Sequence, residues 1–148
     1  MRIIDSSSLR ELDKNRKSNS PMTKMFNSFF ADELSHHEKK IDQYQEDIET
    51  LRGNIEKAGN LLTAEPTIEN LQSFRDLLSR IAKRVSAEAY RLDKVGGTPQ
   101  NPHYHEIITV INREADQLYH LIVKENKDNI AITAKVIGIK GLVVDLIT

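Results

Sequence analysis

The residues with the clearest capacity for metal chemistry are glutamate and histidine side chains at helical spacing. Glu33 and His36 form a Glu-x-x-His motif, which di-iron bundles use, but such sites need a second copy of the motif and further inward-facing glutamates. The sequence contains no second Glu-x-x-His motif. His36-His37 and His103-x-His105 could share a metal only where their two helices meet. We therefore interpret these histidines as surface residues and predict neither a metal site nor a cofactor.

General acid–base chemistry has one candidate pair. His120 follows Asp116 by four residues, so a helix would place the carboxylate where it could orient the imidazole. No serine nucleophile elbow, glycine-rich phosphate loop or second acid accompanies this pair, and the chain has no cysteine. Glu125 and Asn129 occupy apolar seam positions, where a polar residue more often sets register or marks a turn than performs catalysis. The sequence therefore predicts no catalytic residues and a protein that is not an enzyme.

A stripe of basic residues follows one face of the second expected helix. It contains the candidate phosphate-contacting residues Arg80, Lys83, Arg84 and Arg91 together with Lys94, and Tyr90 lies among them. A nucleic-acid backbone could use such a stripe, although the aromatic residues that would stack on bases are few. We favour a solvated face opposite an acidic first helix and keep nucleic-acid binding as the alternative function.

An apolar cluster near the N-terminus is the best candidate surface for docking a partner. Soft and aromatic side chains gather at helical spacing where the chain first becomes apolar, a composition typical of a helix that docks into a groove. The other interpretation is ordinary packing at the base of the bundle. The cluster consists of Met22, Met25, Phe26, Phe29 and Phe30.

Composition sets the broad class of the protein. The 148 residues, 29% of them charged and with a net charge of −1, suit one domain without a global field that would attract nucleic acid. Residues 1–20 are polar and without an apolar period, so we expect a mobile arm there and a single helical-bundle domain over residues 21–148. No signal-like stretch opens the chain, and charges interrupt its most apolar region, residues 130–148. We therefore expect a cytoplasmic protein that does not enter a membrane.

Apolar residues at alternating spacings of three and four predict long amphipathic helices. The first lies within residues 21–63, either whole or in two pieces around residues 35–37. The second is closed by Gly96-Gly97. Short loops make these helices antiparallel neighbours. The helix-start signals lie at Ser20-Pro21, Pro66-Thr67 and Asn101-Pro102.

The path of the polar run Lys124–Asn129 decides the architecture. The third helix, running back along the second, has nothing left to pack against near residue 128. We favour a turn there, so that residues 130–148 return as a fourth helix and complete an antiparallel up-and-down bundle. The alternative is three long helices with a straight C-terminal helix, whose exposed apolar face would demand a partner. Residues 130–148 keep helical rather than strand spacing, and Gly138 and Gly141 indicate close backbone approach or a local bend.

The C-terminal residues 137–148, with the sequence IGIKGLVVDLIT, resemble the ending of the bacterial YaaR family. The similarity extends more weakly through Phe74–Leu78 and Ala87–Leu92 and covers residues 25–148. The resemblance implies a bacterial, cytoplasmic protein, and it implies no catalytic or binding residue because the family has no established activity. It marks a candidate structural or interface element that contains Gly138, Ile139, Gly141 and Leu142.

Taken together, these features predict an interaction or scaffold module that self-associates or binds a protein partner. The motivation is the long apolar seam, the cluster of methionines and phenylalanines, and the missing chemistry. Nucleic-acid binding through the basic stripe comes second. A metal-dependent enzyme with a carboxylate–histidine site comes third.

Overall fold

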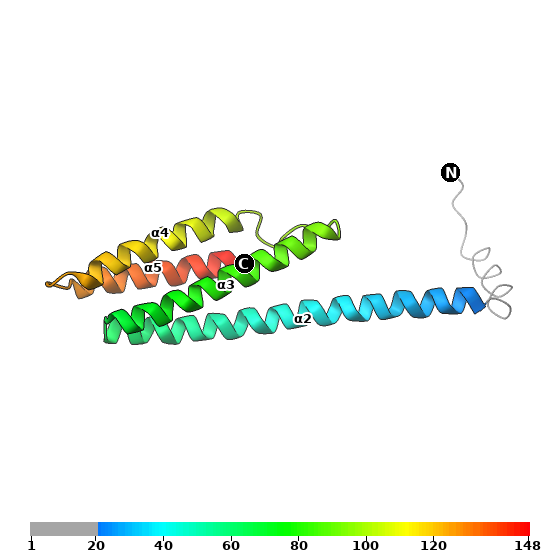
Figure 1. Ribbon diagram of the computed structural model, residues 1–148, viewed down its shortest axis with the longest axis horizontal. Helices are drawn as coiled ribbons and strands as arrows, with labels where there is room; N and C mark the ends of the chain where they lie inside the picture. The colour runs from blue at the N-terminus through cyan, green and yellow to red at the C-terminus, as the bar shows by residue number, and fades with distance from the viewer. Residues whose placement is uncertain (1–20) are drawn as a thin grey trace. The chain divides into compact units, whose positions relative to one another are not determined.

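The computed structural model describes the backbone of residues 21–148 and the side chains of residues 27–148 except residue 37. These residues form four α-helices and no strand: α2 (Pro21–Ala64), α3 (Ile68–Lys94), α4 (Tyr104–Val123) and α5 (Asn129–Ile147) (Figure 1). The predicted all-α fold class is confirmed. The arm predicted for residues 1–20 lies outside the described residues. In the part of the chain that the structure describes, no helix is long and apolar enough to cross a membrane.

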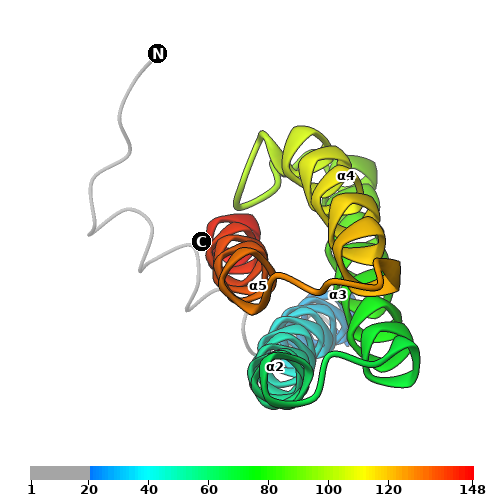
Figure 2. The same ribbon diagram turned by 90° about the vertical axis from the view of Figure 1, so that its left-hand side faces the viewer.

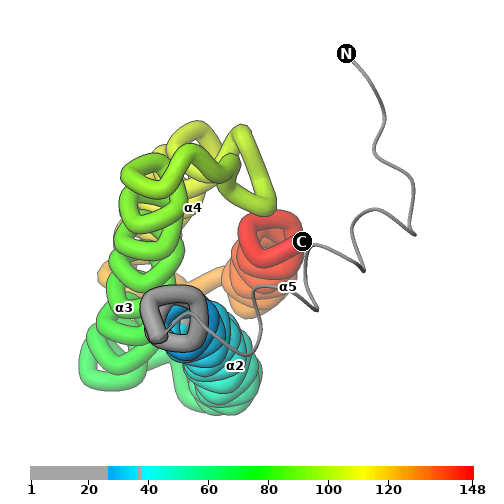
Figure 3. Tube along the Cα trace, turned by 90° about the vertical axis from the view of Figure 1, so that its right-hand side faces the viewer, coloured from blue at the N-terminus to red at the C-terminus, as the bar shows by residue number. Residues whose placement is uncertain are grey.

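The chain divides into two compact units, residues 1–43 and residues 44–148. The second unit is the bundle, and it holds the C-terminal part of α2 together with α3, α4 and α5. Seen end-on, these four helices follow one another around a shared centre in chain order (Figure 2, Figure 3). The first unit includes residues 21–43 of α2.

Ion pairs join each helix of the bundle to its neighbours around this ring. Each pair remains partly exposed, so it stabilises the fold by only about 0–1 kcal/mol but helps to fix the register. Lys127 Nζ donates to the carbonyl of Pro66 at 2.8 Å, which brings the turn before α5 to the end of α2 and makes these two helices antiparallel. The pairs are Arg84–Asp47 at 3.0 Å, Arg75–Asp116 at 2.8 Å, Lys135–Glu114 at 2.6 Å and Lys140–Glu56 at 3.1 Å.

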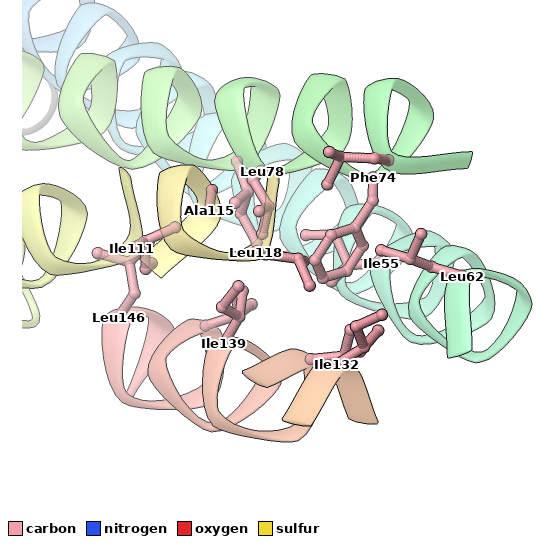
Figure 4. Close-up of a cluster of buried hydrophobic side chains, with 14 of the residues drawn as sticks. Ile55, Leu62, Phe74, Leu78, Ile111, Ala115, Leu118, Ile132, Ile139 and Leu146 are labelled. Carbon is pink, nitrogen blue, oxygen red and sulfur yellow. The ribbon is translucent and has the colours of Figure 1, made fainter. Parts of the chain in front are cut away.

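The predicted seams form the core. Ile55 and Leu62 of α2, Phe74 of α3 and Leu118 of α4 meet Ile139 of α5 in one cluster of fully buried side chains (Figure 4). Burying one such side chain stabilises the fold by about 1.5–3 kcal/mol. Helical spacing in the sequence therefore identifies the residues that exclude water from the centre of the bundle.

The chain turns between α4 and α5, as the favoured interpretation predicts, and the straight-helix alternative is wrong. Lys124 leaves the helix in an extended conformation, and Asp128 caps α5 by accepting hydrogen bonds from the amides of Ile130 and Ala131 at 3.1 Å each. This cap satisfies two backbone donors at the start of α5 that have no partner within the helix. The strand alternative for residues 130–148 is also wrong, since α5 runs from Asn129 to Ile147.

The other helix boundaries follow the predicted signals with one exception. The Thr67 hydroxyl caps α3 by accepting from the amide of Asn70 at 3.2 Å. Gly96, with φ of 79°, and Gly97, whose amide donates to the carbonyl of Leu92 at 2.8 Å, close the same helix as a Schellman motif. The alternative of a first helix broken around residues 35–37 is wrong, because α2 is continuous.

The exception is the start of α4, which we predicted at Asn101-Pro102 and which lies at Tyr104. The Asn101 side chain does not cap the helix. Its oxygen accepts from the amide of His103 at 2.8 Å, and its nitrogen donates to the carbonyl of Asp145 at 2.6 Å. The residue is thus used to tie the α3–α4 loop to the C-terminal end of α5.

Side chains of α5 pack tightly against a glycine of α2 that the sequence did not single out. A Cβ atom added at Gly59 of α2 would lie 3.2 Å from Val136 Cγ1 and 2.5 Å from Lys140 Cε of α5. A Cβ atom at Gly138 or Gly141 would meet nothing within 4 Å. No described part of this chain therefore approaches the two glycines that we expected to mark close packing.

Replacing Asp128 with alanine should lower the free energy of unfolding by about 0.5–2 kcal/mol, because the two capping hydrogen bonds are lost. Urea unfolding followed by circular dichroism measures this change. Glu125→Ala, an exposed residue of the same turn, is the control and should have little effect. Equal midpoints for the two variants would contradict the assigned cap.

Gly53 and Gly59 form a matched pair within α2. Gly53→Ala should stabilise the protein by about 0.5–1 kcal/mol, because alanine is the better helix former and its Cβ meets nothing within 4 Å. Gly59→Ala should not show this gain, because the new methyl group presses on buried Val136. Thermal unfolding of both variants tests the difference, and an equal gain would show that α2 and α5 are not closely packed there.

Candidate interaction surfaces

The helix α5 is apolar on the side that faces solvent as well as on the side that faces the core. Ile130, Ile137 and Val144, spaced seven residues apart, are 83%, 62% and 50% exposed. Ala134 and Gly141 lie between them on the same side and are also exposed. A surface helix of a soluble bundle normally carries polar residues there. We call the exposed residues Ile130, Ala134, Ile137, Gly138, Gly141 and Val144 the outer α5 face.

The lysines of α5 lie beside this face rather than on it. Lys135 turns to α4, where its Nζ donates to Glu114 at 2.6 Å and to Gln117 at 2.7 Å. Lys140 turns to α2, where its Nζ donates to Glu56 at 3.1 Å and to Asn60 at 2.7 Å. Because both amino groups are held by neighbouring helices, Asp145 is the one charged residue left on the solvent side of α5.

The four residues marked by the C-terminal resemblance do not share a surface. Gly138 and Gly141 are exposed on the outer α5 face. Ile139 is fully buried in the core, and Leu142 is half-buried against it. Only the two glycines are therefore available to a partner, while Ile139 and Leu142 hold the bundle together.

A groove of about 520 Å³ runs between α2 and α3 and brings together three of the four candidate phosphate-contacting residues. Arg80, Lys83 and Arg84 line it from α3. Leu51 of α2 and Ala87 of α3 add apolar lining. We call it the α2–α3 groove. It combines apolar lining with basic side chains, a mixture that suits an amphipathic acidic segment better than a bare phosphate chain.

Acidic residues of the bundle already engage Arg84 and Arg91. The Arg84 Nε donates to Asp47 at 3.0 Å, and the Arg91 Nε donates to Glu88 at 3.0 Å. Glu88 is the one buried charged side chain in the described part of the chain, and a buried carboxylate needs such partners. Two of the five basic residues of the predicted stripe thus pair with acids of the bundle, while Arg80, Lys83 and Lys94 are exposed.

Burial raises the pKa of the Tyr44 phenol above its usual value, and the neighbouring Glu88 carboxylate raises it further, while Arg84 lowers it. The guanidinium carbon of Arg84 lies 5.0 Å from the centre of the Tyr44 ring, a cation–π contact. Tyr44 therefore belongs to the same cluster as the arginine and the buried acid, at the start of the bundle part of α2.

Residues 27–43 of α2, which we call the α2 N-terminal segment, expose large apolar side chains. Phe29, Phe30 and Leu34 are 66%, 57% and 50% exposed, and Ile41 is exposed as well. The structure thus places two of the five predicted docking residues, Phe29 and Phe30, on an accessible helix surface. The side chains of the other three, Met22, Met25 and Phe26, lie outside the described residues.

The candidate metal and acid–base residues do not converge. No group of three or more histidine, aspartate or glutamate side chains could hold a metal ion among the residues that the structure describes. The Asp116 carboxylate accepts from Arg75 Nη2 at 2.8 Å, while the His120 ring lies edge-on to Tyr119. His103 and His105 are exposed at the start of α4, where His105 stacks on Tyr104 with ring centres 4.2 Å apart.

The fold and these surfaces define the class of protein as an up-and-down four-helix bundle with exposed apolar helix faces. The chain belongs to the family described as "Protein of unknown function (DUF327)", whose model matches residues 4–147. No curated protein matches the chain. It is similar in structure to an uncharacterised protein, BH1478 from Bacillus halodurans, with a TM-score of 0.68 and 20% sequence identity over 78% of this chain and 97% of that one. At this identity the similarity shows a shared fold.

Substituting Tyr44 with phenylalanine should change how stability depends on pH. Because the folded protein raises the Tyr44 pKa, its proton is held more tightly in the folded state, so the stabilisation is complete below the unfolded pKa of about 10 and is lost as the pH rises through the folded value. The unfolding free energy of the wild type should therefore fall more steeply above about pH 10 than that of Tyr44→Phe. Urea titrations across this range compare the two, and parallel curves would contradict a raised pKa.

Proposed function

We propose that this protein is a non-enzymatic interaction module whose outer α5 face binds an amphipathic helix of another protein. The observation that carries the proposal is the uncharged, apolar surface formed by exposed Ile130, Ile137 and Val144 at heptad spacing. Contiguous apolar surface of this kind on a soluble protein typically marks an interaction site.

The energy available on this face is substantial. Each of the three aliphatic side chains is at least half exposed, so covering it stabilises a complex by roughly 1–2 kcal/mol from the removal of apolar area from water. The face follows nearly the whole of α5, about 28 Å at 1.5 Å per residue. One helix of comparable length would cover it.

The two exposed glycines support a helix as the bound element. Glycine within a helix is less stable than alanine by about 1 kcal/mol, and neither Gly138 nor Gly141 relieves any contact within this chain. Small residues on a helix surface allow a second helix to approach closely, because the ridges of the partner enter the space that they leave. A partner helix therefore gives these glycines a role that the bundle alone does not.

Nucleic-acid binding is the less favoured function. Arg84 and Arg91 are held by Asp47 and Glu88, which reduces the positive charge that a phosphate chain would meet. With Arg84 and Arg91 paired to acids, the electrostatic contacts available to a phosphate chain come mainly from Arg80, Lys83 and Lys94.

The proposal also includes the family and the cellular location of the protein. We take the DUF327 family to be the YaaR family, because the C-terminal sequence of residues 137–148 resembles the ending of that family. The Bacillus neighbour fits a bacterial source. A cytoplasmic protein that assembles with a bacterial partner follows from this assignment.

Charge placed on the outer α5 face should weaken partner binding. The partner is first isolated from bacterial lysate with the tagged full chain and identified, then purified and titrated calorimetrically. Ile137→Asp should weaken its affinity at least about tenfold, because a carboxylate would be buried against an apolar helix. Leu61→Asp, an exposed leucine of α2, is the matched control and should bind like the wild type.

Alanine substitutions at Gly138 and Gly141 distinguish an effect on partner binding from an effect on folding. Gly138→Ala and Gly141→Ala should each raise the thermal stability of the protein, since helix propensity improves by about 1 kcal/mol, while both lower the affinity for the partner. If the two glycines affect folding alone, the affinity for the partner should stay unchanged. No captured partner, or a partner indifferent to Ile137→Asp, would remove the proposal.

A further inference from the structure

The apolar seam of α2 continues past the part of the helix that packs in the bundle. Ile48, Ile55 and Leu62 are buried in the core, and steps of seven residues carry the same series back to Ile41 and Leu34. A seam that continues in register predicts continued helix packing. Ile41 and Leu34 are nevertheless exposed, so this face of the α2 N-terminal segment has no packing partner among the residues that the structure describes.

The charge of this segment indicates which kind of surface could pack against it. Residues 27–43 contain four acidic side chains, Asp32, Glu33, Glu38 and Asp42, and two basic ones, Lys39 and Lys40, which leaves a net charge of −2. Glu33 lies three residues from Phe30 and Glu38 four residues from Leu34, so these two exposed acids flank the apolar face of the helix. The complementary surface is therefore an apolar groove with basic side chains along it.

The α2–α3 groove has this character. Arg80, Lys83 and Arg84 line it against a single acid, Asp47, and Leu51 and Ala87 supply apolar lining. Three basic groups and one acid leave a net positive charge in the groove. The α3 lining from Arg80 to Ala87 spans about two helical turns, as do residues 30–38 of the segment.

One wall of the groove belongs to the same helix as the segment. Thr50 and Leu51, which line the groove from one side, belong to α2, and α2 is a single helix from Pro21 to Ala64. A continuous helix cannot lie alongside itself. The same groove of a second copy has no such restriction.

We infer that the protein forms a two-fold symmetric dimer in which the α2 N-terminal segment of each copy occupies the α2–α3 groove of the other. Phe30 and Leu34 lie on the lining formed by Leu51 and Ala87. Glu33 and Glu38, which flank this apolar face, lie near Arg80 and Lys83 of the partner copy. The two copies exchange identical contacts, as a two-fold interface requires, and the two α2 helices run antiparallel. This dimer does not depend on the outer α5 face.

A charge-swap experiment on the full chain tests this dimer. Sedimentation equilibrium is measured for the wild type, for the groove variant Arg80→Glu/Lys83→Glu, and for the segment variant Glu33→Lys/Glu38→Lys. The wild type should dimerise, and each variant should dissociate at least about tenfold more readily, because like charges then face each other across both contacts. Circular dichroism of each variant establishes that the helices remain folded.

Mixing the two variants gives the decisive result. In a mixed dimer the unchanged acidic segment meets an unchanged basic groove, and the reversed segment meets the reversed groove. An equimolar mixture should therefore dimerise again, although neither variant does so alone. The double reversal Arg113→Glu/Lys124→Glu, at exposed positions elsewhere, is the matched control and should dimerise like the wild type.

Three results would overturn the inference: a monomeric wild type, a dimer that survives both reversals, or a mixture that stays monomeric. Raised salt should also weaken the wild-type dimer, since screening acts on exposed charges. Ile137→Asp should leave the dimer intact. A dimer lost through Ile137→Asp alone would instead place self-association on the outer α5 face.

Discussion

The structure of the bundle depends on the return of the chain at Lys124–Asp128. This turn brings α5 alongside α4 and α2, so that Ile132, Ile139 and Leu146 close the fourth side of the core. Without it, the apolar faces of three helices would have no common cover. The turn is held by a carboxylate cap on the α5 amides and by Lys127, which reaches the loop after α2. A short polar run therefore controls burial of the whole core.

The same turn explains why the outer α5 face exists. A helix at the corner of a four-helix bundle buries one side, yet α5 is apolar around nearly its whole circumference, and apolar helices of this kind are normally buried on all sides. Lys135 and Lys140 reinforce the orientation, because each pairs with an acid of a neighbouring helix. Rotating α5 to hide Ile137 would break both pairs and expose Ile139.

Much of this fold could be predicted from local sequence signals, because those signals act within one turn of the chain. Heptad spacing identified core residues such as Ile55 and Phe74, and the Thr67 cap and the paired glycines at 96–97 marked the ends of α3. What the sequence could not show depends on contacts between distant residues. Asn101 reaches Asp145 instead of capping α4, and Gly59 is significant only because Val136 and Lys140 pack against it.

The same distinction between local sequence signals and contacts of distant residues applies to the candidate surfaces. Sequence spacing identified Arg80, Lys83 and Arg84 as one stripe, but only the structure shows Asp47 and Leu51 beside them in a groove, which replaces a phosphate-binding face with one that fits an acidic apolar helix. The outer α5 face carries almost no charge, whereas the groove and the α2 N-terminal segment are charged with opposite sign. Apolar burial is little weakened by moderate salt, while contacts between exposed charges are screened. If both proposals hold, self-association and partner binding would respond separately to ionic strength.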